Sequence, residues 1–177
     1  MKKAIELTPR NAWAYSRRAS VYLRVHDTQQ ASADFLRSCE LEARNMNETW
    51  MAQWCGICLE RDDLRTVESL EKIAAIDPQN YIAYMCRGVA WYLQKSFEQS
   101  LIELEQATLL EPEEWDAYFW KGMVCAALKC DKDAKSAVEK SLEVDLPPVL
   151  LAPLRWFEQD RPDFYEQYVV PLLARYV

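Results

Sequence analysis

Aromatic and small residues recur along this chain with a period of 34 residues. Three stretches, which follow Pro9, Pro78 and Pro112, align without gaps. In each, an aromatic residue is followed by a small residue, a larger one, a second small residue and a large apolar residue. The aligned sets are Tyr15, Ala19, Tyr22, Ala31 and Phe35; Tyr84, Gly88, Trp91, Ser100 and Leu104; and Tyr118, Gly122, Cys125, Ala134 and Val138. A shared register of this kind predicts repeat units that stack around a continuous core.

Prolines mark the ends of these units. Pro78 and Pro112 are 34 residues apart, and Pro9 closes a third copy upstream. Pro147 closes a fourth copy one place late, and Ala43 stands where a further proline is expected. The spacing therefore supports a repeat over most of the chain.

The pattern resembles the tetratricopeptide repeat, a helix–turn–helix unit of about 34 residues whose signature is an aromatic, Leu-Gly, Tyr, Ala, Phe and Pro. The resemblance implies an all-α fold, a right-handed α-solenoid of such units with C-terminal capping helices. Small residues at Ala19, Gly88 and Gly122 let the two helices of a unit approach closely.

The repeat register divides the chain into predicted segments. Residues 1–11 resemble the last turn of a second helix whose first helix is absent, which favours a truncated or partial unit of a longer solenoid. Four complete units follow at 12–45, 47–80, 81–114 and 115–147. The second departs from the pattern, because Trp54 replaces a small residue and Thr66 replaces an alanine.

After residue 147 the period is lost, and residues 148–177 are predicted to form capping helices. Asp160 and Pro162 suit the start of a helix, and Pro171 is expected to kink it. Its apolar residues form one stripe: Phe164, Tyr165, Tyr168, Val169, Leu172, Leu173 and Tyr176. Three interpretations stay open, namely a cap on the core, a homodimer face and a helix that occupies the binding groove.

Composition and charge narrow the function classes. The net charge of −7 argues against a general affinity for nucleic acid, because phosphate binding needs a positive surface. Residues 1–45 are nevertheless basic, with eight Lys and Arg against five Asp and Glu, whereas residues 46–114 carry five against thirteen. No apolar run has the length of a membrane span, and no secretory signal precedes the six cysteines. A cytoplasmic protein that binds neither membrane nor nucleic acid is predicted.

Catalytic and metal-binding patterns lack their usual context. The single histidine, His26, falls at a predicted turn with no nucleophile placed beside it, and no glycine-rich phosphate loop occurs. Cys55 and Cys58 form a Cys-x-x-Cys, which serves dithiol chemistry or half of a zinc site. No second pair completes a zinc site, and no strand precedes the motif, so groove lining is the favoured interpretation. We predict a non-enzymatic protein without cofactor or metal.

The resemblance implies protein binding in a concave groove lined by the first helix of each unit. The repeat register places these candidates there: Met51, Cys55, Cys58, Leu59, Ile82, Met85, Val89, Tyr92, Phe119 and Met123, with Trp13, Ser16 and Ser20 in the first unit. This largely apolar set favours a hydrophobic peptide or an amphipathic helix as the protein partner. Two alternatives remain. The side chains are covered by the chain's own terminal helices or by the next repeat, or the solenoid is a regulatory or self-associating arm of a larger multidomain protein.

Overall fold

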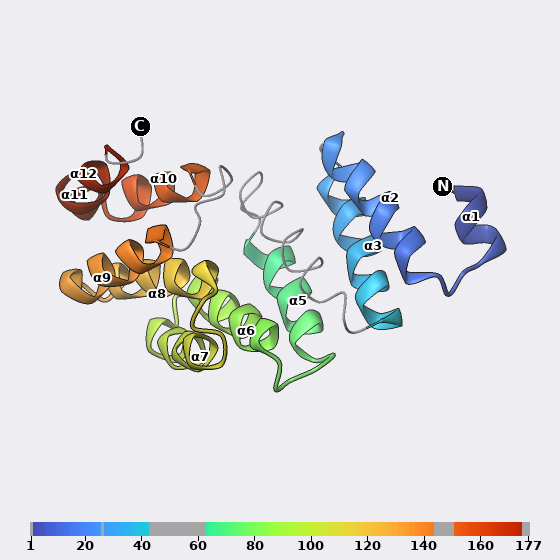
Figure 1. Cartoon of the computed structure of the whole chain (residues 1–177), viewed down its shortest axis with the longest axis horizontal. Helices are drawn as coiled ribbons and strands as arrows, with labels where there is room; N and C mark the ends of the chain where they lie inside the picture. The colour runs from blue at the N-terminus through green and yellow to red at the C-terminus, as the bar shows by residue number, and fades with distance from the viewer. Residues whose placement is uncertain (1, 26, 43–62, 144–150, 175–177) are drawn as a thin grey trace. The chain divides into compact units, whose positions relative to one another are not determined.

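A computed structural model describes residues 2–25, 27–42, 63–143 and 151–174 (Figure 1). Within these ranges every regular element is a helix, as the repeat pattern predicts. The elements are α1 (Lys2–Leu7), α2 (Ala12–Arg24), α3 (Thr28–Leu41), α5 (Asp63–Ala74), α6 (Tyr81–Leu93), α7 (Phe97–Leu110), α8 (Trp115–Ala127), α9 (Asp131–Glu143), α10 (Leu151–Asp160), α11 (Pro162–Phe164), the π-helical turn η3 (Tyr165–Val169) and α12 (Val170–Leu173). The chain divides into two compact units, residues 1–90 and residues 91–177.

In the first unit, α2 and α3 form a tightly packed antiparallel pair. The Asn11 side chain accepts a hydrogen bond from the Ala14 amide (3.2 Å), and Asp27 accepts one from the Gln30 amide (3.1 Å). Each polar side chain satisfies an amide that the first turn of its helix leaves without an internal partner. The predicted small positions Ala19 and Ala31 are buried between the two helices.

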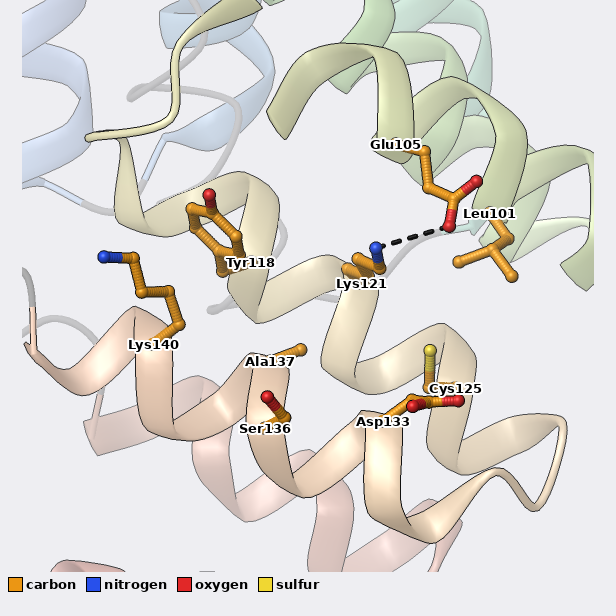
Figure 2. Close-up of a pocket in the computed structure, with 9 residues that line it drawn as sticks. All are labelled: Leu101, Glu105, Tyr118, Lys121, Cys125, Asp133, Ser136, Ala137 and Lys140. Carbon is orange, nitrogen blue, oxygen red and sulfur yellow. Dashed lines mark ion pairs between the residues drawn. The ribbon is translucent and has the colours of Figure 1, made fainter. Parts of the chain in front are cut away.

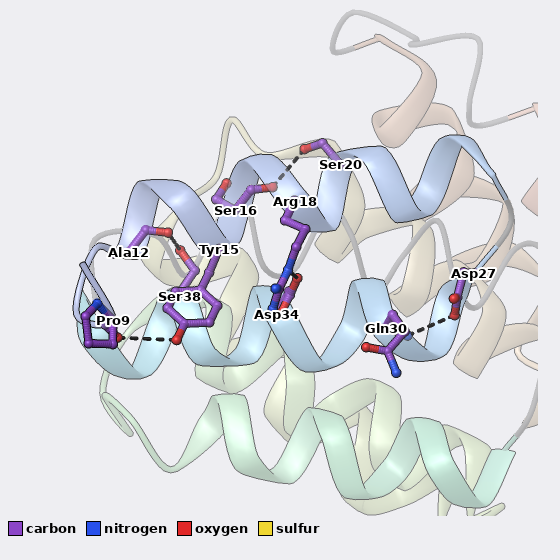
Figure 3. A network of polar contacts seen from close by, with 10 residues as sticks. All are labelled: Pro9, Ala12, Tyr15, Ser16, Arg18, Ser20, Asp27, Gln30, Asp34 and Ser38. Carbon is purple, nitrogen blue, oxygen red and sulfur yellow. Dashed lines mark hydrogen bonds and ion pairs between the residues drawn. The ribbon is translucent and has the colours of Figure 1, made fainter. Parts of the chain in front are cut away.

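A polar network also joins α2 to α3 (Figure 3). The Arg18 guanidinium binds both carboxylate oxygens of Asp34, at 2.6 and 2.7 Å. This hydrogen-bonded pairing with Asp34 raises the pKa of Arg18 above its ordinary value. Nearby, the Ser38 hydroxyl donates to the Ala12 carbonyl at 2.9 Å. Because a two-pronged guanidinium–carboxylate pair fixes orientation as well as distance, the network sets which side of α2 turns away from α3.

In the second unit, α7, α8 and α9 pack in sequence. A Cβ atom built on Gly122 of α8 lies only 2.8 Å from Cγ2 of Val138 on α9, so the close approach of these helices requires glycine there. The turns that end α6 and α8 place Lys95 and Lys129 at positive φ, 61° and 62°. These residues are one repeat period apart and close the helix ends as a left-handed cap does.

The C-terminal helices pack onto α8 and α9 within the second unit. Rings of Trp156 and Phe157 on α10 lie 5.6 Å from Trp120 and 6.0 Å from Phe119 on α8. Arg161 then reaches back to the Ala126 carbonyl and to Asp131. These contacts hold α10 against α8 and α9.

A π-helical turn, Tyr165–Val169, precedes Pro171, the residue at which the sequence predicts a kink. The Val170 amide donates to the Tyr165 carbonyl, five residues back, and Pro171 follows at once. A proline ring clashes with the carbonyl four residues earlier in a regular helix, and the wider turn relieves that clash. Of the predicted apolar stripe, Phe164, Val169 and Leu172 are buried, and Tyr165, Tyr168 and Leu173 are partly buried.

Candidate functional site

The predicted groove residues fall into two groups. Met51, Cys55, Cys58 and Leu59 lie outside the described residues, as does His26. The other six, on α6 and α8, are buried, and none exposes more than 6% of its surface: Ile82, Met85, Val89, Tyr92, Phe119 and Met123. In their present packing these six side chains offer a guest almost no surface.

Helix α10 is a direct reason for this burial in the second unit. It carries Phe157, which packs edge-on against Phe119. It also ends with Asp160, whose carboxylate accepts a hydrogen bond of 2.8 Å from the Tyr92 hydroxyl. Two of the six buried candidates are therefore in contact with the chain's own terminal helix, which is one of the alternatives that the sequence leaves open.

One side of α2 has the opposite character. Trp13 is 65% exposed and Val21 is 42% exposed, and Arg17 lies between them along the helix. The Arg17 guanidinium sits over the Trp13 ring, 5.5 Å from its centroid. We call Trp13, Arg17 and Val21 the α2 outer stripe. Tryptophan is rarely left in water to this extent, so the stripe is a candidate contact surface.

The opposite side of α2 explains why the stripe faces outward. Tyr15, Arg18, Ala19 and Tyr22 occupy the face turned toward α3, where Arg18 is paired with Asp34. In a helix of 3.6 residues per turn, Trp13 and Arg17 fall on the side away from that face. The pairing of Arg18 with Asp34 therefore holds α2 with its outer stripe facing solvent.

The same register positions on α8 are covered. Asp116, Trp120 and Val124 correspond to the stripe residues, and all three are buried. The Trp120 ring packs between Tyr92 at 5.5 Å and Trp156 at 5.6 Å, from α6 and α10. In the unit that contains α8, a position equivalent to the α2 outer stripe therefore packs against other helices.

A cavity of about 520 Å³ opens between α7, α8 and α9 of the second unit (Figure 2). We call it the α7–α9 pocket. Its lining combines charged, polar and apolar side chains: Leu101, Glu105, Tyr118, Lys121, Cys125, Asp133, Ser136, Ala137 and Lys140. Residues of this kind, scattered over three helices, gave no signal as a motif, and the sequence did not predict the pocket.

Charges in the α7–α9 pocket are partly paired. The Lys121 ammonium lies 3.3 Å from a carboxylate oxygen of Glu105 on α7. Burial raises the pKa of the Cys125 thiol to about 11, so this thiol stays protonated near neutral pH and is a poor nucleophile. Among the described residues, no group of three or more His, Cys, Asp and Glu side chains could hold a metal ion.

Comparison with known proteins agrees with the repeat pattern. A family model described as tetratricopeptide repeat matches residues 1–31. Anaphase-promoting complex subunit 3 of Schizosaccharomyces pombe is 25% identical over 125 residues, which is 70% of this chain and 18% of that protein. The chain thus spans about a fifth of the curated relative that it matches.

Solved structures of repeat proteins share the fold. TTC0263, a thermophilic TPR protein of Thermus thermophilus, superposes with a TM-score of 0.61 at 15% identity, covering 97% of this chain and 87% of its own. PilW, a type IV pilus biogenesis factor, gives 0.60 at 18% identity, with coverage of 99% and 82%. YrrB, described as a TPR protein with an unusual peptide-binding site, gives 0.55 at 17% identity, with coverage of 99% and 97%.

The repeat register, the matched family model and the shared fold lead to one assignment. The chain has the all-α solenoid fold of tetratricopeptide-repeat proteins, and a model of that repeat matches its first 31 residues. Proteins of this class are in general interaction scaffolds rather than enzymes, and they bind protein or peptide partners. Within the described residues, no helix combines the length and apolar character needed to cross a membrane.

Proposed function

We propose that this chain is a non-enzymatic scaffold that binds a peptide or an amphipathic helix of a protein partner. The binding face is formed by the first helices of the repeat units, and the α2 outer stripe is its accessible anchor. One observation carries the proposal: Trp13 and Val21 are exposed, whereas Asp116 and Val124, at the same register positions on α8, are buried.

The chemistry of the stripe indicates what the partner presents. Trp13 offers a large, rigid apolar surface, and a tryptophan of this kind often supplies much of the energy of an interface. Arg17 adds a positive charge, while the neighbouring Arg18 is already paired with Asp34. An amphipathic helix with acidic residues beside its apolar face therefore complements the stripe best.

The buried candidates take a supporting role in this proposal. Met85 and Val89 are buried in the first unit and Phe119 in the second, so none of them touches the partner in the packing described. A guest reaches Tyr92 and Phe119 only if α10 moves aside. Cys55 and Cys58 remain predicted contacts of the same face.

Two synthetic peptides test the proposal. Both are about 20 residues long, which gives five to six helical turns, and both carry the same leucine stripe. One has glutamates and the other lysines on the polar face, and calorimetry measures their binding to the folded chain. We expect the acidic peptide to bind more tightly. We expect Trp13→Ala to lower the affinity for the acidic peptide by about 30-fold, because an interface residue that contributes about 2 kcal/mol is lost.

Trp91→Ala is the matched control, because Trp91 is a partly exposed tryptophan outside the stripe. Arg17→Glu should shift the preference toward the basic peptide. Binding that is equally strong in Trp13→Ala and Trp91→Ala, or no binding of either peptide, would rule out the α2 outer stripe as the anchor.

A second candidate is a regulatory or self-associating arm of a larger protein. It is favoured by the match to a relative that is several times longer than this chain and is named as a subunit of a complex. Self-association through the C-terminal helices predicts a dimer mass in sedimentation. Val170, which is 39% exposed on α12, is the position to change, and Val170→Glu should then restore the monomer.

A further inference from the structure

The α7–α9 pocket is bounded on one side by a single face of α9. Asp133, Ser136 and Lys140 follow one another at helical spacings of three and four residues, Ala137 lies next to Ser136, and all four line the cavity. Figure 2 shows Lys140 beside Tyr118 at one end and Asp133 beside Cys125 at the other. The apolar part of the lining comes from Leu101, Ala137 and the Tyr118 ring.

Two charges of this lining are left for a ligand. Glu105 and Lys121 neutralise each other across α7 and α8. Asp133 and Lys140 form no ion pair with any residue that the structure describes. The α7–α9 pocket therefore presents a carboxylate at one end and an ammonium at the other, with apolar contacts from Leu101, Ala137 and the Tyr118 ring elsewhere in its lining.

The separation of these charges sets the size of the complementary group. Seven residues of helix span about 10 Å, so the Asp133 and Lys140 backbone positions are about that far apart along α9. An extended peptide covers about the same length in three residues. The cavity volume also lies within the range of sites that hold small ligands or short peptide segments.

We propose that the α7–α9 pocket binds an extended segment of a partner protein, in which a basic and an acidic residue flank two mainly apolar residues. The basic residue pairs with Asp133, the acidic residue pairs with Lys140, and the apolar residues lie against Leu101 and Ala137. This second docking site goes beyond the helix-binding face, since it has different chemistry and does not involve α2.

The dipole of α9 accounts for the signs of these two charges but not for the cavity. An acidic residue near the start of a helix and a basic residue near its end are both favourable. That effect requires no concave surface between them. The proposal rests on the cavity together with the charges at its two ends.

The pocket and the predicted groove use different sides of α8. Tyr118, Lys121 and Cys125 line the pocket. Phe119 and Met123 lie more than a quarter-turn around the helix from them, given about 100° per residue. Changes in the pocket lining on α9 therefore leave binding at the α2 outer stripe intact, and the two proposals can fail separately.

Capped tetrapeptides titrated into the isotope-labelled chain provide the test, with amide NMR shifts as the signal. Acetyl-Lys-Leu-Ala-Glu-amide and its reversed sequence carry the mixed charges, and peptides with two lysines or two glutamates are the comparison. Ionic strength near about 0.15 M screens the general attraction of cations to this acidic chain. We expect one mixed-charge peptide to bind about fivefold more tightly than either uniform peptide, with shifts concentrated on α7, α8 and α9.

A charge reversal sharpens the result. Lys140→Glu should lower the affinity for the mixed-charge peptide and raise the affinity for the two-lysine peptide, each by about fivefold. Lys132→Glu makes the same change of charge on an exposed part of α9 outside the pocket and should do neither. Equal behaviour of these two variants, uniform peptides that bind as well as mixed ones, or shifts centred elsewhere would each overturn the proposal. If Lys140→Glu still binds the acidic peptide of about 20 residues at α2, the proposed function stands even where the pocket proposal has failed.

Discussion

Helices α2 and α8 are the same element of the repeat, yet they differ in what packs on them. Both turn one face toward the second helix of their unit, and both carry a small residue there, Ala19 and Gly122. The other face of α8 holds Trp120 between two aromatic rings, whereas that of α2 leaves Trp13 exposed. A repeat therefore fixes a helix's register without fixing its function. A neighbouring helix determines whether the same position stabilises the fold or remains available for a partner.

The largest expected contrast is between two tryptophan substitutions. Trp120→Ala removes a fully buried ring and should cost about 3–5 kcal/mol in the free energy of unfolding. Trp13→Ala should stay within about 0.5 kcal/mol, because its ring is exposed. Denaturant titration followed by circular dichroism measures both. Similar losses in the two variants would mean that Trp13 is already covered by the folded chain.

An intermediate effect is expected where the paired helices meet. Gly122→Ala forces a methyl group against Val138 and should cost about 1–2 kcal/mol, after the better helix propensity of alanine is counted. Adding Val138→Ala makes room for the methyl group, so the double variant should be more stable than the sum of the single effects predicts. Additive losses in this cycle would show that the close approach of α8 and α9 does not require glycine.

The smallest effect concerns the acid end of the pH range. Hydrogen bonds from Arg161 lower the pKa of Asp163 to about 2. Since the folded-state pKa lies below the ordinary value, this pair adds stability above about pH 4, and the contribution is lost as pH falls toward about 2. NMR titration of the Asp163 carboxyl should show its pKa rising toward the ordinary value in Arg161→Ala. Arg37→Ala, which removes an exposed pair in the first unit, should leave it unchanged.

The sequence predicts the helices well because each has local signals. Helices α2, α6 and α8 begin at residues 12, 81 and 115, shortly after Pro9, Pro78 and Pro112, since proline turns and polar caps act over a few residues. Small residues at Ala31 and Ala134 are buried as their register predicts. The all-helical repeat fold is confirmed.

The candidate site depends on contacts that periodicity does not encode. Phe119 and Trp13 both fall on groove positions, yet Phe119 is buried, with Phe157 of α10 packed against it, whereas Trp13 is exposed. The α7–α9 pocket is equally hidden, because its charges come from three helices and no local motif links Glu105 with Lys140. Local patterns predict faces, whereas the packing of distant segments determines which faces remain open.

The cluster of the Tyr92, Trp120 and Trp156 rings, which meet at steep angles, has a spectroscopic consequence. Two indole groups held 5.6 Å apart at an interplanar angle of 54° couple their electronic transitions, and such coupling is optically active in the ultraviolet. Trp13, whose closest described ring contact is an arginine, contributes no such coupling. The protein therefore has an intrinsic optical reporter on α10: release of this helix from α8 separates the two indoles and removes the coupled signal without any added label.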